Sequence, residues 1–193
     1  MAQSSQTISG QKTFKSAITV SEGATFTATG GVYKITASST SLANLAVRDL
    51  ITVTGTTNNN ATFTVKSVDA NGTYITVEET VVAEASDGST DTVLTYSGFV
   101  TDKYKGDGYY SQADGIHTVA YHVNTTCTGA IKMQGSLATT PTEDDWFDIT
   151  GTTFTTDLST TISSNNFTGN FVWVRAKCTS NTAGSVTKIL YNN

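Results

Sequence analysis

The chain has 193 residues, of which 37% are hydrophobic and 14% are charged, and its formal net charge is −5. This length suits one large β domain or two small ones, and the apolar fraction is sufficient for a packed core. The acidic balance, with only 11 Lys and Arg in the whole chain, excludes a basic face for nucleic acid and offers nothing to an anionic membrane.

Residues 1–20 are polar apart from a few isolated apolar side chains. We expect them to form an extended arm, too polar to fold alone, that adds strands to a neighbouring subunit. The apolar anchors of this arm would be Ile8, Phe14, Ile18 and Val20. The first ten residues, MAQSSQTISG, contain no charged segment followed by an apolar stretch, so we expect no secretory signal and synthesis in a cytoplasm.

Residues 21–98 predict a small antiparallel β domain. Its strand-like segments are ATFTATG, VYKITAS, DLITVTG, ATFTVKSV and TYITVEE. In ATFTVKSV, Phe63 and Val65 share one face, which is the two-residue period of a half-buried strand. Asn71-Gly72 predicts a hairpin turn before TYITVEE because both residue types tolerate positive φ. Residues 41–50 predict a single helical turn.

Residues 99–115 are rich in Gly, Tyr and Asp and predict a linker between two domains. Residues 116–193 then alternate strand patterns with turn signals, as in β-sandwiches and jelly rolls. In GNFVWVRAKCTS, Val172, Val174, Ala176 and Cys178 predict a core face, and Phe171, Trp173, Arg175 and Lys177 an amphipathic one. The predicted fold is therefore all-β, with two small antiparallel β domains and a sandwich-like C-terminal one.

The sequence contains no constellation that predicts catalysis. The two histidines, His117 and His122, lie five positions apart in one predicted strand, which places them on opposite faces. His117 shares its face with apolar residues and is interpreted as a core histidine. The segment GDGYYS at 106–111 lacks the third glycine of a nucleotide-binding loop. We expect neither an enzyme nor a cofactor.

Two acidic sets and two cysteines are the candidates for metal binding and for a disulfide. Glu143, Asp144 and Asp145 could hold Ca²⁺ with backbone carbonyls, although a solvated turn is the simpler interpretation. A second acidic set, which lacks the ligand spacing of an EF-hand, comprises Asp102, Asp107 and Asp114. We expect no metal site. Cys127 and Cys178 are interpreted as reduced thiols, since cytoplasmic synthesis disfavours a disulfide.

Aromatic side chains in the second half are the remaining candidates for binding. Tyr109, Tyr110 and Trp173, together with Arg175, could contact a protein partner or a glycan, because exposed aromatic rings favour both. The alternative is that Trp146 and Trp173 anchor the sandwich core. Trp173 shares its predicted face with Arg175 and Lys177, and an Arg–Trp stack there would suit either an interface or an exposed sheet.

Several segments resemble structural proteins of tailed bacteriophages. QTISGQKTF at 6–14 resembles an element near the start of tail-fibre proteins, where it often precedes a trimeric β region. The block from DLITVTG to ETVVAE resembles a β module of virion proteins. The segments GSLATTPTEDDWFDI and GNFVWVRAKCTSNTAGSVTKILYN resemble virion β-sandwich domains. The tail-fibre element occurs once, which favours a short spike, a capsid decoration protein or an adaptor over a long fibre.

The resemblance implies a non-enzymatic virion protein, a homotrimer that decorates the capsid or attaches at the neck or tail through its N-terminal arm. Its partners would be other virion proteins, and its location the phage particle assembled in the bacterial cytoplasm. The alternative is a carbohydrate-binding or host-receptor-binding tip. That alternative requires a solvent-facing cluster of Tyr109, Tyr110 and Trp173.

Overall fold

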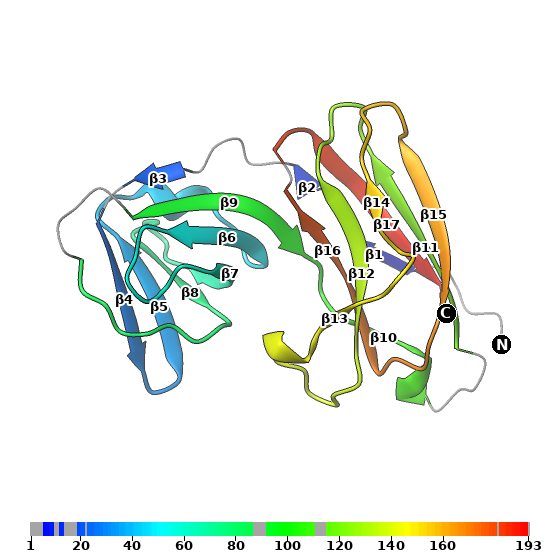
Figure 1. Ribbon diagram of the computed structural model, residues 1–193, viewed down its shortest axis with the longest axis horizontal. Helices are drawn as coiled ribbons and strands as arrows, with labels where there is room; N and C mark the ends of the chain where they lie inside the picture. The colour runs from blue at the N-terminus through cyan, green and yellow to red at the C-terminus, as the bar shows by residue number, and fades with distance from the viewer. Residues whose placement is uncertain are drawn as a thin grey trace. The chain divides into compact units, whose positions relative to one another are not determined.

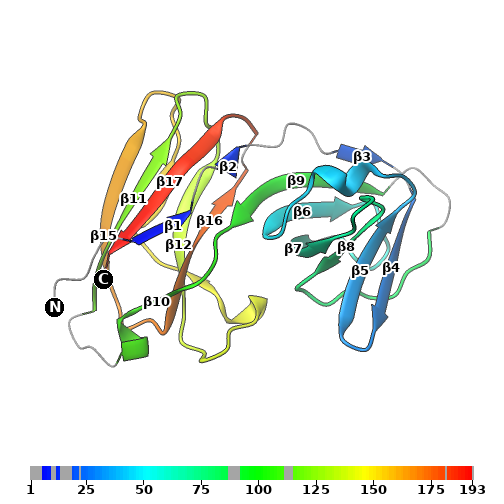
Figure 2. The ribbon, with the colours of Figure 1, turned by 180° about the vertical axis from the view of Figure 1, so that it is seen from behind.

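The computed structural model describes residues 6–9, 12–13, 19–21, 23–86, 92–110, 115–180 and 182–192. The protein is all-β, with antiparallel pairing throughout the described strands and only single turns of 3-10 helix (Figures 1 and 2). It divides into two compact units, one formed by 15–99 and the other by 1–14 together with 100–193. The predicted fold class is confirmed.

The unit formed by 15–99 is built on one antiparallel sheet, in the order β9-β6-β7-β8-β5-β4, with β3 added to β9. Its elements are β3 (Thr19–Ser21), β4 (Ala24–Thr29), β5 (Val32–Ala37), η1 (Ser41–Asn44), β6 (Asp49–Thr54), β7 (Thr62–Val68), β8 (Tyr74–Val77) and β9 (Val93–Val100). Phe63 and Val65 are both buried as predicted, and Thr64 between them is buried as well. The single helical turn predicted within 41–50 is η1.

The predicted hairpin between β7 and β8 is present at Asp69–Gly72. The amide of Gly72 donates to the carbonyl of Asp69 at 2.9 Å, and the Asp69 carboxylate accepts a hydrogen bond from the Thr73 hydroxyl at 2.8 Å. Gly72 has φ +68° and leaves no room for a side chain, since a Cβ would stand 2.4 Å from the backbone nitrogen of Ala43. The turn therefore needs glycine for both its conformation and its packing.

The unit containing 100–193 is a two-sheet sandwich (Figure 1). One sheet has the order β1-β17-β11-β15, with β2 added to β17, and the other has β13-β12-β16, with β10 on β16 and β14 on β12. The strands of the first sheet are β1 (Gln6–Ser9), β2 (Lys12–Thr13), β11 (Ile116–Val123), β15 (Ile162–Thr168) and β17 (Ser185–Asn192). Those of the second are β10 (Tyr104–Lys105), β12 (Ala130–Ser136), β13 (Phe147–Asp148), β14 (Phe154–Thr155) and β16 (Trp173–Thr179), with η2 (Asp107–Tyr110) and η3 (Glu143–Asp145) in loops.

The core of the sandwich lies between these two sheets. Tyr121 of β11 stacks on Phe154 of β14 at 6.3 Å between ring centroids, and its hydroxyl donates to the carbonyl of Thr152 at 2.8 Å. Val174, Ala176 and Cys178 of β16 are fully buried, as their alternation predicts. Val172 and Phe171 precede β16, and Phe171 is buried although the alternation placed it on the outer face.

Where the structure describes residues 1–20, the backbone pairs within the same chain and is not extended toward another subunit. Gln6–Ser9 and Lys12–Thr13 pair with β17, and Thr19–Ser21 pairs with β9, all within the same chain. The main-chain groups of these short strands are therefore used inside the protomer. Phe14 and Ile18 lie outside the described residues, and only the backbone is described for Ile8 in β1 and Val20 in β3.

The predicted linker, 99–115, is also more structured than the sequence indicates. Its residues from Val100 onward belong to the sandwich unit, where β10 pairs with β16 and η2 follows directly. The boundary between the units lies at Phe99–Val100, close to the predicted start of the linker. No helix within the described ranges is long and apolar enough to cross a membrane.

Candidate functional site

Three aromatic side chains gather on the surface of the sandwich unit. The ring of Tyr109 meets the rings of Tyr110 and Trp173 edge to face, with 5.2 Å between centroids in each pair. Tyr109 and Tyr110 are 44% and 52% exposed, and Trp173 is partly exposed. The structure thus brings together the three residues that the glycan or partner hypothesis requires.

Two glycines allow η2 to lie directly against the chain that leads into β16. The amides of Gly106 and Gly108 donate to the carbonyls of Val172 and Phe171 at 3.0 and 2.9 Å. A Cβ on Gly106 would stand 2.4 Å from the carbonyl oxygen of Phe171. The pattern GDGYY is therefore a close-packing motif that fixes the two tyrosines beside Trp173, and not a phosphate loop.

Two lysines cover the aromatic rings. The Nζ of Lys103 lies 4.6 Å from the ring centroid of Trp173, and the Nζ of Lys105 lies 4.0 Å from that of Tyr109. An ammonium over a ring face is attracted by the ring quadrupole, by about 0.5–1 kcal/mol at an exposed site. The indole Nε1 of Trp173 donates to the carbonyl of Thr139 at 3.0 Å, which fixes the ring. We call Lys103, Lys105, Tyr109, Tyr110 and Trp173 the lysine–aromatic cluster.

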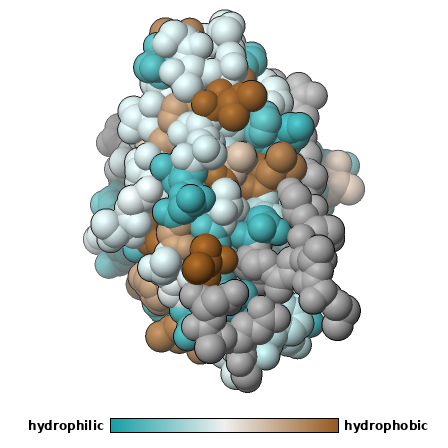
Figure 3. All heavy atoms as spheres, turned by 90° about the vertical axis from the view of Figure 1, so that its right-hand side faces the viewer, coloured by the Kyte–Doolittle hydropathy of each residue, from teal (hydrophilic) through white to brown (hydrophobic). Residues whose placement is uncertain are grey.

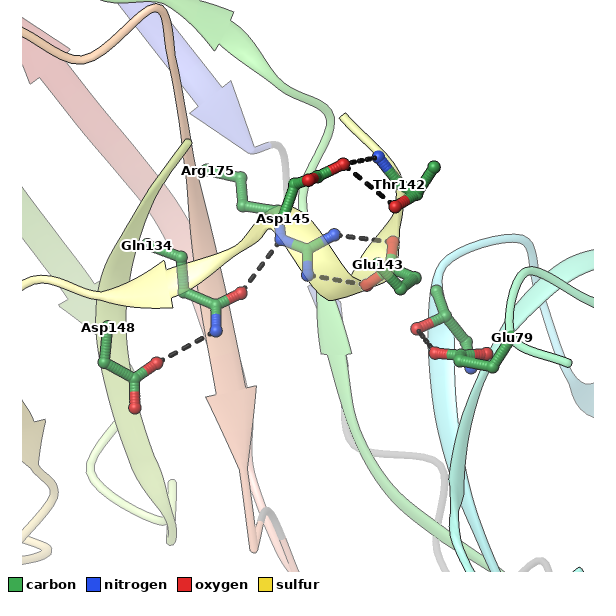
Figure 4. Close-up of polar contacts among 8 residues, drawn as sticks. Glu79, Gln134, Thr142, Glu143, Asp145, Asp148 and Arg175 are labelled. Carbon is green, nitrogen blue, oxygen red and sulfur yellow. Dashed lines mark hydrogen bonds and ion pairs between the residues drawn. The ribbon is translucent and has the colours of Figure 1, made fainter. Parts of the chain in front are cut away.

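Arg175 is not part of this cluster, because it stacks on Trp146 and not on Trp173. Its guanidinium lies over Trp146, with 4.3 Å to the ring centroid. Nη1 and Nη2 donate to the two carboxylate oxygens of Glu143 at 2.8 and 2.7 Å, and Nε donates to Gln134 at 2.9 Å (Figure 4). Arg175 is buried, and its guanidinium is held by these contacts, so it is a poor candidate for binding a partner.

The polar network continues along the same sheet face. The amide of Gln134 donates to Asp148 at 2.9 Å (Figure 4), and Lys132 forms an ion pair with the other oxygen of that carboxylate. Burial alone would raise the pKa of Asp148, but the hydrogen bonds from Lys132 and Gln134 outweigh it and hold the pKa below its usual range. Burial and the nearby Arg175 lower the pKa of Lys177. The network is internally compensated and presents no reactive group.

The acidic run before Trp146 does not converge on one point. Glu143 turns to Arg175, whereas the carboxylate of Asp145 accepts hydrogen bonds from the amide and hydroxyl of Thr142 at 2.7 and 2.9 Å. Asp114 of the second acidic set lies outside the described residues. Within the described part of the chain, no group of three His, Cys, Asp or Glu side chains could hold a metal ion. Trp146 itself is partly exposed and is not the core anchor that the sequence suggests.

The histidines are where the sequence places them. His117 is fully buried, and its Nε2 lies 2.7 Å from the carbonyl of Gly169, an acceptor, so Nε2 carries the proton. Its Nδ1 and the hydroxyl of Tyr191 form a hydrogen bond at 2.8 Å. Burial and the charge of Asp107 raise the pKa of Tyr191. Both ring nitrogens are engaged inside the core, and His122 lies on the opposite face, so neither serves as a base at the surface cluster.

The two cysteines are both buried free thiols in the structure. Burial, together with the nearby Cys127, raises the pKa of Cys178 to about 12. A thiol with so high a pKa is almost entirely protonated near neutral pH and is a weak nucleophile. These residues therefore contribute to packing and not to a reactive site.

Lys103 and Lys105 are the residues that sequence reasoning missed. The signal was present, because KYKGDGYY interleaves lysines with tyrosines, as cation–π clusters do. No family model matches the chain, and no curated protein matches it significantly.

Proposed function

We propose that this chain is a non-enzymatic structural protein of a bacteriophage particle, which decorates the capsid or attaches at the neck or tail by adhesion. The resemblance of its segments to virion proteins supports the location. The lysine–aromatic cluster supports the mechanism, and it is the surface that we assign to the contact with another virion protein.

The observation that carries this proposal is the exposure of a preorganised aromatic surface. Tyr109 and Tyr110 keep about half of their surface accessible while the backbone beneath them is fixed by Gly106 and Gly108. Tyr and Trp bury much area for little conformational entropy, which is why they dominate the binding energy of protein interfaces. Lysines at the edge of such a cluster would pair with carboxylates of the partner and increase the association rate.

Attachment through an arm of residues 1–20 is not part of this proposal. The backbone of the described strands β1, β2 and β3 is already paired within the protomer, so these strands would have to detach before binding a neighbour. The cluster needs no such rearrangement.

The test is co-sedimentation of the purified chain with assembled phage heads and, separately, with assembled tails, both from particles that lack it. We expect saturable binding to one of the two, and a loss of at least about tenfold in affinity for Tyr110→Ala combined with Lys103→Ala, since a hot-spot residue is worth more than about 1 kcal/mol. Leu137→Ala, at an equally exposed apolar position outside the cluster, is the control. Absence of binding to both heads and tails contradicts the proposal.

A glycan is the second candidate ligand, because the same cluster meets the requirement stated for a receptor-binding tip. The ammonium groups over Trp173 and Tyr109 occupy ring faces on which a neutral sugar would stack. They favour a saccharide that bears carboxylate groups. Binding to uronic or sialic acid glycans on an array, abolished by Lys103→Ala and Tyr110→Ala, would replace the protein partner with this ligand.

A further inference from the structure

The strand β15 is an unprotected edge of the sandwich unit. Among the strands that the structure describes, it pairs with β11 alone, over seven residues without a bulge. Its sequence, ISSNNFT, contains no charge and no proline, which are the usual devices against pairing with another chain. The opposite edge of the same sheet, β1, is short and carries an irregularity between Thr7 and Ser9.

The backbone groups that point away from β11 can be assigned from the register. The amide of Gly169 donates to Gly115, and the amide of Val123 donates to Thr161, both at 2.9 Å. Hydrogen-bonded positions recur at every second residue of an antiparallel pair, so the odd-numbered residues of β15 bond to β11. The free N–H and C=O groups of the edge therefore belong to the even-numbered residues, which are Ile162, Ser164, Asn166 and Thr168.

These four residues are arranged symmetrically about Asn165, the centre of the strand. A two-fold axis at Asn165 places Ile162 opposite Thr168 of a second copy, and Ser164 opposite Asn166. Even-numbered residues then face even-numbered residues, so all outward backbone groups find partners in one antiparallel register. A register shifted by one residue would pair even with odd positions and satisfy none of them.

Asn165 itself supplies an independent reason for a partner. Its Nδ2 is buried and has no hydrogen-bond partner among the described residues. An unsatisfied buried donor costs about 1–3 kcal/mol. In the two-fold register, Asn165 of the second copy lies directly opposite, and its carboxamide oxygen can accept that hydrogen bond.

Exposed apolar groups lie where the second copy would cover them. A groove of about 670 Å³ runs from the Asn166–Thr168 end of β15 to Phe147–Thr150 at the edge of the other sheet. Ile116 and Phe147 line it and are 60% and 44% exposed. In the two-fold register, Ile162 of the second copy, itself 56% exposed, lies beside Thr168 at this groove.

The charge of this region also suits a second copy. Among the described residues that line the groove, Asp148 alone is ionisable, and its carboxylate already accepts from Lys132 and Gln134. β15 lies on the side of the sandwich unit that Figure 3 presents, where hydrophobic side chains stand among hydrophilic ones.

We propose that two copies of this chain associate by antiparallel pairing of their β15 strands about a two-fold axis at Asn165, in place of the trimer expected from the sequence.

The first experiment measures the mass of the full chain in solution by sedimentation equilibrium over a micromolar to hundred-micromolar range. We expect a reversible dimer. Ser164→Pro removes an N–H that faces the partner and not β11, so it should leave a folded monomer with an unchanged circular dichroism spectrum. A monomer at all concentrations, a trimer, or a dimer that survives Ser164→Pro would each overturn the proposal.

The second experiment tests the register without relying on that variant. Under mild oxidation Asn165→Cys should form a disulfide-linked dimer, because Cα atoms of a directly opposite non-hydrogen-bonded pair lie about 4.5 Å apart. Asn166→Cys is the matched control, since two such positions would be offset by two residues and should not cross-link. The native Cys127 and Cys178 are buried, so the unchanged chain should form no disulfide-linked dimer. Equal cross-linking of the two variants, or of neither, would overturn the register.

Discussion

The guanidinium of Arg175 and the carboxylate of Glu143, 32 residues apart in the sequence, form a bidentate ion pair. The distances are 2.8 Å from Nη1 to Oε1 and 2.7 Å from Nη2 to Oε2. Arg175 is almost wholly inaccessible to solvent and Glu143 is largely so. The pair attaches the loop that contains η3 to the middle of β16. Its parallel bonds fit the planar geometry of both groups, which is the strongest form of such a contact.

Removing one member of this pair should destabilise the sandwich unit strongly. Glu143→Gln leaves Arg175 charged and buried without its counter-ion, and we expect a loss of about 3 kcal/mol in the free energy of unfolding. Urea denaturation followed by tryptophan fluorescence measures this loss. The control is Asp144→Asn, an exposed neighbour, which should change the free energy of unfolding by less than about 0.5 kcal/mol. Equal effects of both variants would mean that the pair is not structural.

Alanine substitutions at two glycines with similar positive φ should distinguish the cost of backbone strain from the cost of steric overlap. Gly31→Ala places a side chain at φ +77° in open space, so it should cost about 1 kcal/mol. Gly72→Ala has a similar φ but also drives a Cβ to 2.4 Å from the backbone of Ala43, so we expect it to cost at least about 2 kcal/mol more. Thermal unfolding of the two variants provides the comparison, and equal midpoints would contradict the close approach.

Stability at acidic pH should depend on Asp157. Backbone hydrogen bonds from Thr160 and Ser159 hold the pKa of this carboxyl far below its ordinary value of 3.8. The folded state therefore binds its proton less readily than the unfolded state, so its contribution is fully present above about pH 4 and declines as the pH falls through and below that value.

The measurement is the unfolding midpoint in urea from neutral pH down to strongly acidic pH. Asp157→Ala should be less stable than the unchanged chain at neutral pH, and the difference between them should shrink with acidification. Asp144→Ala, which removes an exposed carboxylate, should show no such convergence. A difference that stayed constant with pH would show that the turn is held by other contacts.

The two thiols should report on opening of the sandwich core. Since Cys127 and Cys178 are buried and the pKa of Cys178 is raised to about 12, a disulfide reagent such as Ellman's should react slowly with the native chain at neutral pH. Both thiols should react at once in denaturant. Rapid reaction of either cysteine without denaturant would contradict its burial.

Much of the fold was predictable because it follows from local patterns. Alternation placed Phe63 and Val65 in the core, Asn71-Gly72 identified a turn, and the odd separation of His117 and His122 put them on opposite faces. These features depend on the two-residue period of a strand and on the steric freedom of glycine, and both can be recognised in short stretches of sequence.

The aromatic cluster could be predicted only in part. Its three aromatic residues were named from their composition and context, but nothing local indicated that η2 would lie against β16, because that contact depends on two carbonyls from 170–172 reaching Gly106 and Gly108. The partners of Arg175 could not be predicted for the same reason. Trp173 is two residues away on the same face, yet the guanidinium contacts Glu143 and Trp146, which come from a distant loop.

The sequence by itself determined the all-β class, and it contains no local catalytic motif. Only the tertiary structure decided which strands lie at the edges and whether the first twenty residues pair inside or outside the protomer. Strand alternation specifies which face of a strand is buried, but it carries no information about which neighbour accepts the backbone hydrogen bonds. Long-range strand pairing decides which neighbour each strand has, and among the described strands it places β15 at the edge of its sheet.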